Sequence, residues 1–170
     1  MITTSAASQA WSAEGWADVL STGASLTGFC IFRSTTLGEG IAPLQTQTAP
    51  ATLILPFDNT AGQHVMGIAL GNIATTTTTA TVTVSAWDVN GNSLLTAAPV
   101  EYHASDPAGH GSTTWPAGGH DAFMLNTAIP QTTGIRGIVR FQIGGGALTG
   151  VGLRVGLAQS TFTSAPVTLQ

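Results

Sequence analysis

Short stretches in which apolar and polar residues alternate restrict the fold of this chain more than any other feature. In Thr81–Trp87, the apolar residues Val82, Val84 and Ala86 lie on one face of an extended strand. Turn residues recur about every ten positions, and no stretch keeps the roughly 3.6-residue period of a helix over three turns. The sequence therefore predicts an all-β protein, an antiparallel two-sheet β-sandwich of about ten short strands.

Further strands are expected where β-branched and aromatic residues cluster between turn residues. They are Thr52–Phe57, Val65–Asn72, Ser93–Ala97 and Asp121–Asn126. Asn90-Gly91 separates Thr81–Trp87 from Ser93–Ala97. This residue pair is preferred in type I′ turns because both central residues need a positive φ. The two flanking strands are therefore predicted to form a β-hairpin.

The chain also contains an internal repeat, in which residues 9–44 echo residues 131–167 within a single domain spanning 1–170. Identical residues recur at an offset of 122 positions and, after one inserted residue, of 123: Gln9 and Gln131, Gly15 and Gly137, Gly23 and Gly145, Leu26-Thr27-Gly28 and Leu148-Thr149-Gly150, Ala42-Pro43 and Ala165-Pro166. Each copy reads as strand, turn and strand: Gly15–Leu20 with Leu26–Phe32, and Gly137–Ile143 with Thr149–Val155. Repeated supersecondary units are typical of stacked or arrayed architectures.

Composition excludes several classes of partner. Charged residues make up 7% of the chain, against about 25% in ordinary soluble proteins. Lysine is absent, the net charge is -4, and the cations are Arg33, Arg136, Arg140 and Arg154. Such a chain has no basic surface for nucleic acid or anionic lipid. No apolar run approaches the ~20 residues that span a bilayer, so membrane insertion is not expected.

Uncharged polar residues must cover a surface so poor in charge. Such surfaces are tolerated best in secreted or cell-surface proteins, or where neighbouring subunits bury them. An extracellular or cell-surface location is therefore expected. The opening residues Met1–Ser8 lack the basic-then-apolar pattern of a signal peptide, so we expect that an export signal has already been removed, with a protein that is not exported as the alternative.

Residues 101–116 depart from the strand rhythm and are predicted to form a long loop, a kind of segment that is commonly functional. His103, His110, His120 and Asp121 lie in or beside it, and imidazole and carboxylate groups together can bind zinc. The histidines are seven and ten residues apart, which matches no recognised ligand pattern. We interpret them as surface and turn residues, with a metal site as the alternative. No cofactor is expected.

No catalytic motif stands out. The chain has no Gly-x-Ser-x-Gly nucleophile elbow, and Gly144-Gly145-Gly146 leads into a strand and not into a phosphate-binding helix. Cys30 is the single cysteine, and its apolar neighbours predict a small core residue. The four tryptophans are interpreted mainly as core or interface residues. As the alternative, exposed loop aromatics such as Tyr102 and Trp115 would stack on sugar rings.

Five segments together carry a family resemblance: Leu55–Thr60, Gly67–Asn72, Ala80–Asn92, Trp115–Phe123 and Gly152–Arg154. They resemble an immunoglobulin-like β-sandwich module that occurs, often in tandem, in secreted or surface proteins of soil bacteria such as acidobacteria. The resemblance covers about Gly28 to Pro166. It implies no catalytic residue, and it implies that residues 101–116 are an insertion. It also implies that a hairpin such as residues 15–33 ends one module and precedes the next.

The sequence thus predicts a non-enzymatic extracellular structural protein that self-associates as a subunit of a filament, surface layer or matrix. A hairpin without its own sheet needs strands to join, because two strands alone are marginally stable in water. The residues expected at interfaces are Trp16, Leu26, Phe29, Phe32, Tyr102 and Trp115. A glycan-binding or adhesion module of a secreted protein is the alternative function.

Overall fold

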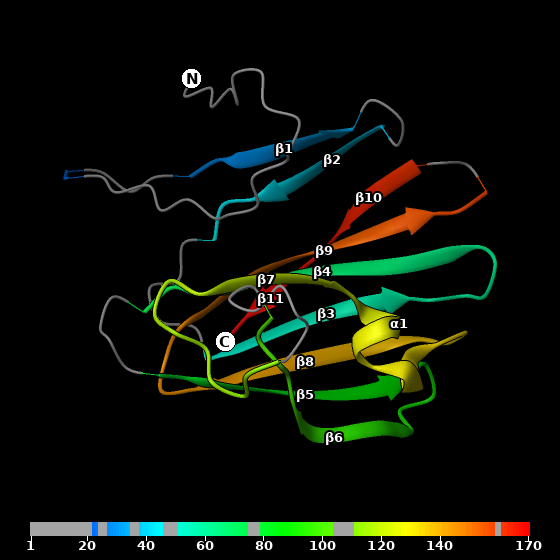
Figure 1. Cartoon of the computed structure of the whole chain (residues 1–170). Coiled ribbons are helices and arrows are strands. Elements are labelled where there is room, and N and C mark those ends of the chain that lie inside the picture. Colours follow the sequence, from blue (N-terminus) through cyan, green and yellow to red (C-terminus); the bar gives the residue numbers. More distant parts are fainter. Residues whose placement is uncertain are drawn as a thin grey trace.

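The computed structural model describes residues 22–23, 27–34, 38–45, 51–74, 79–103, 111–158 and 161–170, with residues 32–34 described by their backbone only. Antiparallel β-strands dominate this part of the chain (Figure 1), which confirms the predicted all-β class. In order the elements are β1 (Phe29–Ser34), β2 (Gly38–Pro43), β3 (Thr52–Asp58), β4 (His64–Asn72), β5 (Thr81–Asp88), β6 (Ser93–Pro99), β7 (His120–Met124), α1 (Leu125–Ala128), the 3-10 turn η1 (Pro130–Thr132), β8 (Arg136–Gly144), β9 (Leu148–Gly156), β10 (Thr161–Ala165) and β11 (Thr168–Leu169). Among the described residues, no helix is long and apolar enough to cross a bilayer.

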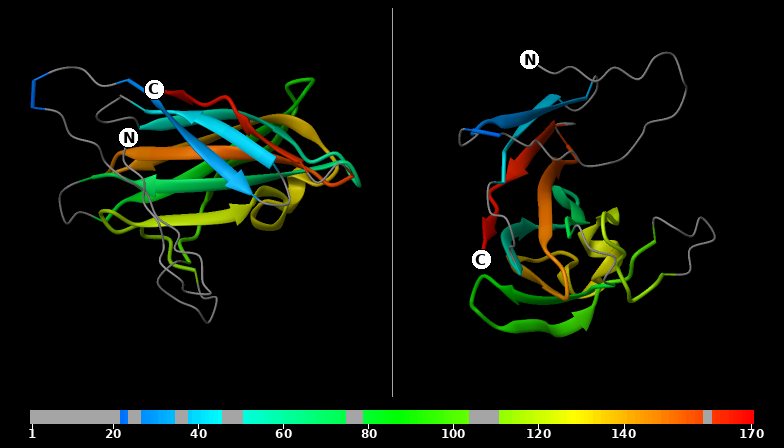
Figure 2. Two further views of the ribbon diagram at one scale, coloured as in Figure 1. Left: turned by 90° about the horizontal axis from the view of Figure 1, so that it is seen from above. Right: turned by 90° about the vertical axis from the view of Figure 1, so that its left-hand side faces the viewer.

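Two sheets enclose the hydrophobic core as a β-sandwich (Figures 1 and 2). A four-stranded sheet has the order β10-β9-β4-β7, and a five-stranded sheet has the order β11-β3-β8-β5-β6. Because side chains alternate along a strand, each sheet turns one apolar face inward. The side chains that fill the core from the sheets include Leu53, Leu55, Met66, Ile68, Leu70, Val82, Val84, Val139, Phe141 and Leu148. We call the part of the chain from β3 to β11 the sandwich module.

The back half of the repeat does not form the hairpin that its sequence predicted. β8 pairs with β3 and β5, whereas β9 pairs with β4 and β10, so the two consecutive strands belong to different sheets. The glycines between them make this crossing possible. Gly145 has a φ of +82°, and a Cβ on Gly146 would lie 2.6 Å from the Asn72 side chain. The chain therefore passes from sheet to sheet through a space that admits no side chain.

Two local predictions also require correction. The strand expected at Asp121–Asn126 ends at Met124, because the buried Leu125 starts the single turn α1 and Pro130 then begins η1. The β5–β6 hairpin is confirmed, but its turn is not type I′, since Gly91 has a positive φ and Asn90 does not. The Asp88 side chain instead accepts hydrogen bonds from the Asn90 and Asn92 backbone amides, at 2.8 Å each.

The front half of the repeat contains a separate two-stranded sheet formed by β1 and β2. The sequence predicted a strand at Leu26–Phe32 with Gly15–Leu20 as its partner. The observed strand β1 starts at Phe29 and pairs with β2 instead. No strand was predicted at Gly38–Pro43, where β2 lies, because this segment is rich in glycine. Gly15–Leu20 lies outside the described residues. The β1–β2 hairpin lies beside β10, at the edge of the sandwich module (Figures 1 and 2).

The pairing register relates this hairpin to the C-terminal one. With the sequence offsets of 122 and 123, Cys30 corresponds to Gly152 and Ala42 to Ala165. Cys30 pairs with Ala42, and Gly152 pairs with Ala165. Four further pairs agree in the same way, from Ile31 with Ile41 and Leu153 with Ser164 to Ser34 with Gly38 and Gly156 with Thr161, whereas Phe29 with Pro43 has no counterpart in β9–β10. The repeat is therefore a repeat of hairpins, with β1–β2 equivalent to β9–β10, one strand further along the chain than predicted.

Candidate functional site

One face of the β1–β2 hairpin carries large apolar side chains that are exposed to solvent, and the alternation of side chains puts Glu39, near the turn, on this same face. Phe29 is 63% exposed, Ile31 is 54% exposed, and its cross-strand partner Ile41 is 53% exposed. Pro43 pairs with Phe29 and completes this face. Large apolar side chains gathered on one exposed surface are typical of contact sites. We call the four residues Phe29, Ile31, Ile41 and Pro43 the hairpin patch.

The opposite face of the hairpin packs against the module. Gly40 is buried, and a Cβ there would come within 2.6 Å of the Phe162 ring on β10. The Ser164 hydroxyl donates to the Ile41 carbonyl, and the Gln45 side chain contacts Thr149 and Gly150 on β9. A groove of about 240 Å³ remains between the end of the hairpin and the strands β9 to β11. These contacts hold the hairpin so that Phe29, Ile31 and Ile41 of its patch are exposed, while Pro43 borders this groove.

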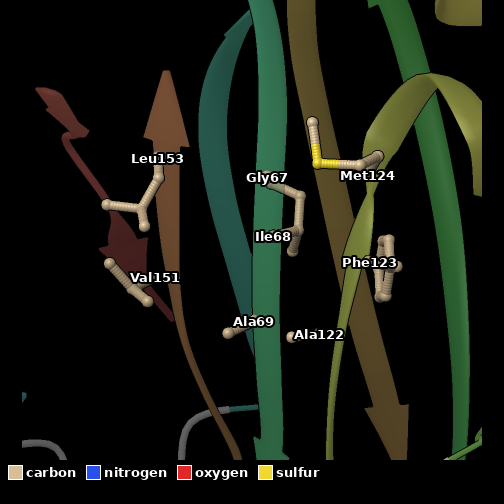
Figure 3. Close-up of a pocket in the computed structure, with 8 residues that line it drawn as sticks. All are labelled: Gly67, Ile68, Ala69, Ala122, Phe123, Met124, Val151 and Leu153. Carbon is tan, nitrogen blue, oxygen red and sulfur yellow. The ribbon is translucent and has the colours of Figure 1, made fainter. Parts of the chain in front are cut away.

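A second apolar surface lies on the outer face of the four-stranded sheet (Figure 3). It is a groove of about 270 Å³ over β9, β4 and β7. The groove is lined by Gly67, Ile68, Ala69, Ala122, Phe123, Met124, Val151 and Leu153. No lining residue carries a charge. The small residues Gly67 and Ala69 on the middle strand β4 leave a hollow between the larger side chains of Leu153 and Met124. We call this surface the sheet groove.

The repeat connects these two surfaces. Phe29 and Ile31 of the hairpin patch correspond to Val151 and Leu153 of the sheet groove at the offset of 122. Two successive positions on this face of the repeated strand are therefore apolar in both copies, although neither pair is fully buried. An exposed strand face that only needs to meet water normally carries polar residues. Its apolar character in both copies indicates a contact surface.

Asp58 lies close to basic side chains from both sheets at one end of the module. Its carboxylate lies 3.2 Å from Arg136 Nε on β8, 2.9 Å from Arg154 Nη2 on β9 and 3.5 Å from His64 Nδ1 on β4. Burial alone would raise the pKa of Asp58. Hydrogen bonds from Thr60 and Arg154, with the charge of Arg136, outweigh that effect and hold the pKa well below its usual range. The cluster acts as a cross-link between the sheets.

The predicted metal candidates divide into described and undescribed residues. The His103 backbone amide donates to Asp121 Oδ2 at 2.7 Å, and its ring nitrogens lie 3.4 Å from Glu101 and from Asp121. His120 begins β7 and pairs with Gly71, and His110 lies outside the described residues. Within the described part of the chain, no group of three His, Cys, Asp or Glu residues is arranged to hold a metal ion.

The expected interface aromatics in the 101–116 loop are core residues instead. Trp115 is fully buried and donates from its indole nitrogen to the Val100 carbonyl at 3.0 Å. Tyr102 is 8% exposed and packs against it, with ring centroids 5.2 Å apart. The interpretation of Trp115 as a core residue is confirmed, and its use as an exposed sugar platform was wrong. Neither ring presents a face on which a sugar could stack.

The other predicted contact residues lie in or next to the hairpin. Phe29 is exposed as expected, the backbone of Phe32 lies in β1, and Trp16 and Leu26 lie outside the described residues. Cys30 was expected in the core but is exposed, because β1 belongs to a two-stranded sheet over which the described part of the chain places no second sheet. The sheet groove was not predicted from the sequence. The pattern that could have predicted this groove is the alternation of Val151 and Leu153 with glycines. That pattern does not say whether the apolar face of the strand is buried in the core or exposed.

The chain matches no protein-family model, no curated protein and no solved structure. The resemblance to immunoglobulin-like modules therefore stays a prediction. Function must be inferred from the geometry of the hairpin patch and the sheet groove.

Proposed function

We propose that this protein is a non-enzymatic structural subunit that works outside the cell and self-associates into a filament, surface layer or matrix. The observation that supports this proposal best is the β1–β2 hairpin. It repeats a hairpin of the module, yet β1 has β2 as its one paired neighbour among the described strands. Its module equivalent β9 has two paired neighbours, β4 and β10. Among the described strands, the second edge of β1 is therefore without a partner, and it lies next to an exposed apolar patch.

The charge distribution favours association. Exposed strand edges are normally protected from pairing by lysine or other charges. This chain has no lysine, and the only charged residues in β1 and β2 are Arg33 and Glu39, which pair with each other across the hairpin. Their opposite charges offset one another, so they provide little repulsion between copies. The low-charge surface also fits an extracellular location, as the composition predicted.

Light scattering coupled to size-exclusion chromatography tests the proposal. The purified chain is expected to form species larger than a monomer, whose mass increases with concentration because association follows mass action. Electron microscopy of the concentrated sample should then show extended or layered assemblies. A chain that stays monomeric at high concentration and near-physiological salt contradicts the proposal.

A further inference from the structure

The hairpin patch cannot be covered by the module to which it belongs. Gly40 and Ser164 hold the opposite face of the hairpin against β10, so Phe29, Ile31 and Ile41 point outward. The hairpin also cannot replace its equivalent in a second module by strand exchange. Cys30 would occupy the place of Gly152, where a Cβ already comes within 2.6 Å of Leu55. Phe32 would replace Arg154, which binds Asp58. A second copy must therefore meet the patch from outside.

The sheet groove is the apolar surface that the patch fits. It lies on the same outer face of the four-stranded sheet that β2 already covers at Phe162 within the chain. Among the described residues, the part of that face over β9, β4 and β7 forms the sheet groove, which is a separate hollow from the covered part. Its volume of about 270 Å³ is large enough for the Phe29 ring, and its lining offers no charged group that would be left buried. Two strand faces packed in this way form an ordinary sheet-on-sheet contact.

We propose that the hairpin patch of one molecule packs into the sheet groove of a second molecule. The inference rests on the proposed self-association and adds which surfaces meet. The patch and the groove are different surfaces of one chain, so the contact is head-to-tail and leaves a free patch at one end of any pair and a free groove at the other. Repeated contacts of this kind extend in a line, unless their geometry closes a ring.

Disulfide trapping between two single-cysteine variants tests the contact directly. Both variants carry Cys30→Ser, which removes the native thiol; one adds Ile31→Cys in the patch and the other adds Ala122→Cys in the groove. The matched control replaces the groove variant with Thr96→Cys. Thr96 is exposed on β6, which belongs to the five-stranded sheet and not to the sheet that carries the groove. Docking raises the local concentration of the paired thiols, so the patch–groove mixture should give about tenfold more mixed dimer than the control.

The outcomes separate the inference from the proposed function. Equal yields in the two mixtures, together with assembly by light scattering, overturn the patch–groove contact but leave self-association standing. A chain carrying both Ile31→Cys and Ala122→Cys should give a ladder of linked oligomers. If it gives a monomer with an internal disulfide, the groove is occupied by its own hairpin and the inference is wrong. A strictly monomeric wild-type chain overturns both.

A pair of charge variants provides a second measurement that does not depend on thiols. Ile31→Lys places a charge in the patch, and assembly should weaken at least about tenfold because the charge would be buried in an apolar groove. Ile138→Lys is the control, since Ile138 is 49% exposed on the outer face of the other sheet and lies outside both surfaces. Equal weakening by both variants, with normal folding by circular dichroism, overturns the assignment of the patch.

Discussion

The two hairpins β1–β2 and β9–β10 share a pairing register but have different surroundings. β9 lies between two strands and turns Gly152 and Arg154 toward the five-stranded sheet, whereas β1 has one neighbour and no facing sheet among the described strands. The residues differ accordingly: Cys30 stands in place of Gly152, and Phe32 in place of Arg154. Hairpin geometry is therefore set locally by pairing, while the residues that a hairpin tolerates are set by what covers it.

The largest difference in stability between the two hairpins is expected at Gly152 and its equivalent Cys30. In Gly152→Val, the new side chain would collide with Leu55, Met66 and Ala165, whose atoms lie 2.6, 3.1 and 3.2 Å from a Cβ placed there. We expect a loss of about 3 kcal/mol in the free energy of unfolding, because a close-packed core has little room to adjust. The equivalent Cys30→Val should change it by less than about 0.5 kcal/mol. Urea denaturation of dilute protein measures both, and similar losses at the two positions would mean that β1 is buried as β9 is.

The second position, Arg154 in β9 and Phe32 in β1, differs because Arg154 forms an ion pair with Asp58. Asp58→Ala removes the partner of Arg136 and Arg154 and should cost about 2 kcal/mol, less than a fully buried ion pair because both arginines can reach water. Thermal unfolding measures the loss. Glu39→Ala in the hairpin is the comparison and should cost less than about 0.5 kcal/mol. An unchanged Tm for Asp58→Ala would contradict the role of the cluster as a cross-link.

The same aspartate predicts an acid dependence. Its pKa is lower in the folded chain than in the unfolded chain, so its contribution to stability is complete above its usual pKa. That contribution is lost as the pH falls below about 4 toward the folded-state value. Stability measured from pH 7 to pH 2 should therefore decline more steeply for the wild type than for Asp58→Asn. Parallel curves would show that the carboxylate is not stabilised on folding.

The smallest expected effect concerns the exposed faces. Ile31→Thr should change the free energy of unfolding of the dilute chain by less than about 0.5 kcal/mol, since the side chain is already 54% exposed. Leu153→Thr, its equivalent in the sheet groove, should cost about 1 kcal/mol because Leu153 is half-buried by neighbouring strands. Chemical denaturation resolves this difference. A larger cost at Ile31 than at Leu153 would reverse the proposed contrast between the hairpins.

Local patterns in the sequence predicted strands better than they predicted partners. Thr81–Trp87 was found because its alternation and the following Asn-Gly are encoded within a few residues. Gly38–Pro43 was missed because its glycines carry no alternation, and its strand forms only by pairing with β1. The separation of β8 and β9 into two sheets depends on partners β3 and β4, which lie far away in the chain. Such non-local choices leave no periodic signal.

The candidate site shows the same limit. Phe29 could be singled out because an aromatic residue in a repeated strand is conspicuous, and it is exposed. Tyr102 and Trp115 looked like loop aromatics, yet isolated bridges join Tyr102 to Ser112 and Trp115 to Ala80, and both rings turn into the core. Whether an aromatic ring is inside or outside depends on how its loop returns to the sheet. That return is a tertiary contact which composition does not encode.

The crossing of the chain from one sheet to the other at Gly144–Gly146 affects how the protein folds during its synthesis. β8 lies in the middle of one sheet and β9 in the middle of the other, so residues 136–156 supply the central strand that each sheet needs. On the ribosome, the earlier strands emerge before the strands that join them. Because such distant pairing is slow, the apolar faces of the earlier strands stay exposed until residues 136–156 have been synthesised. A chaperone that binds extended segments would meet this protein during that interval.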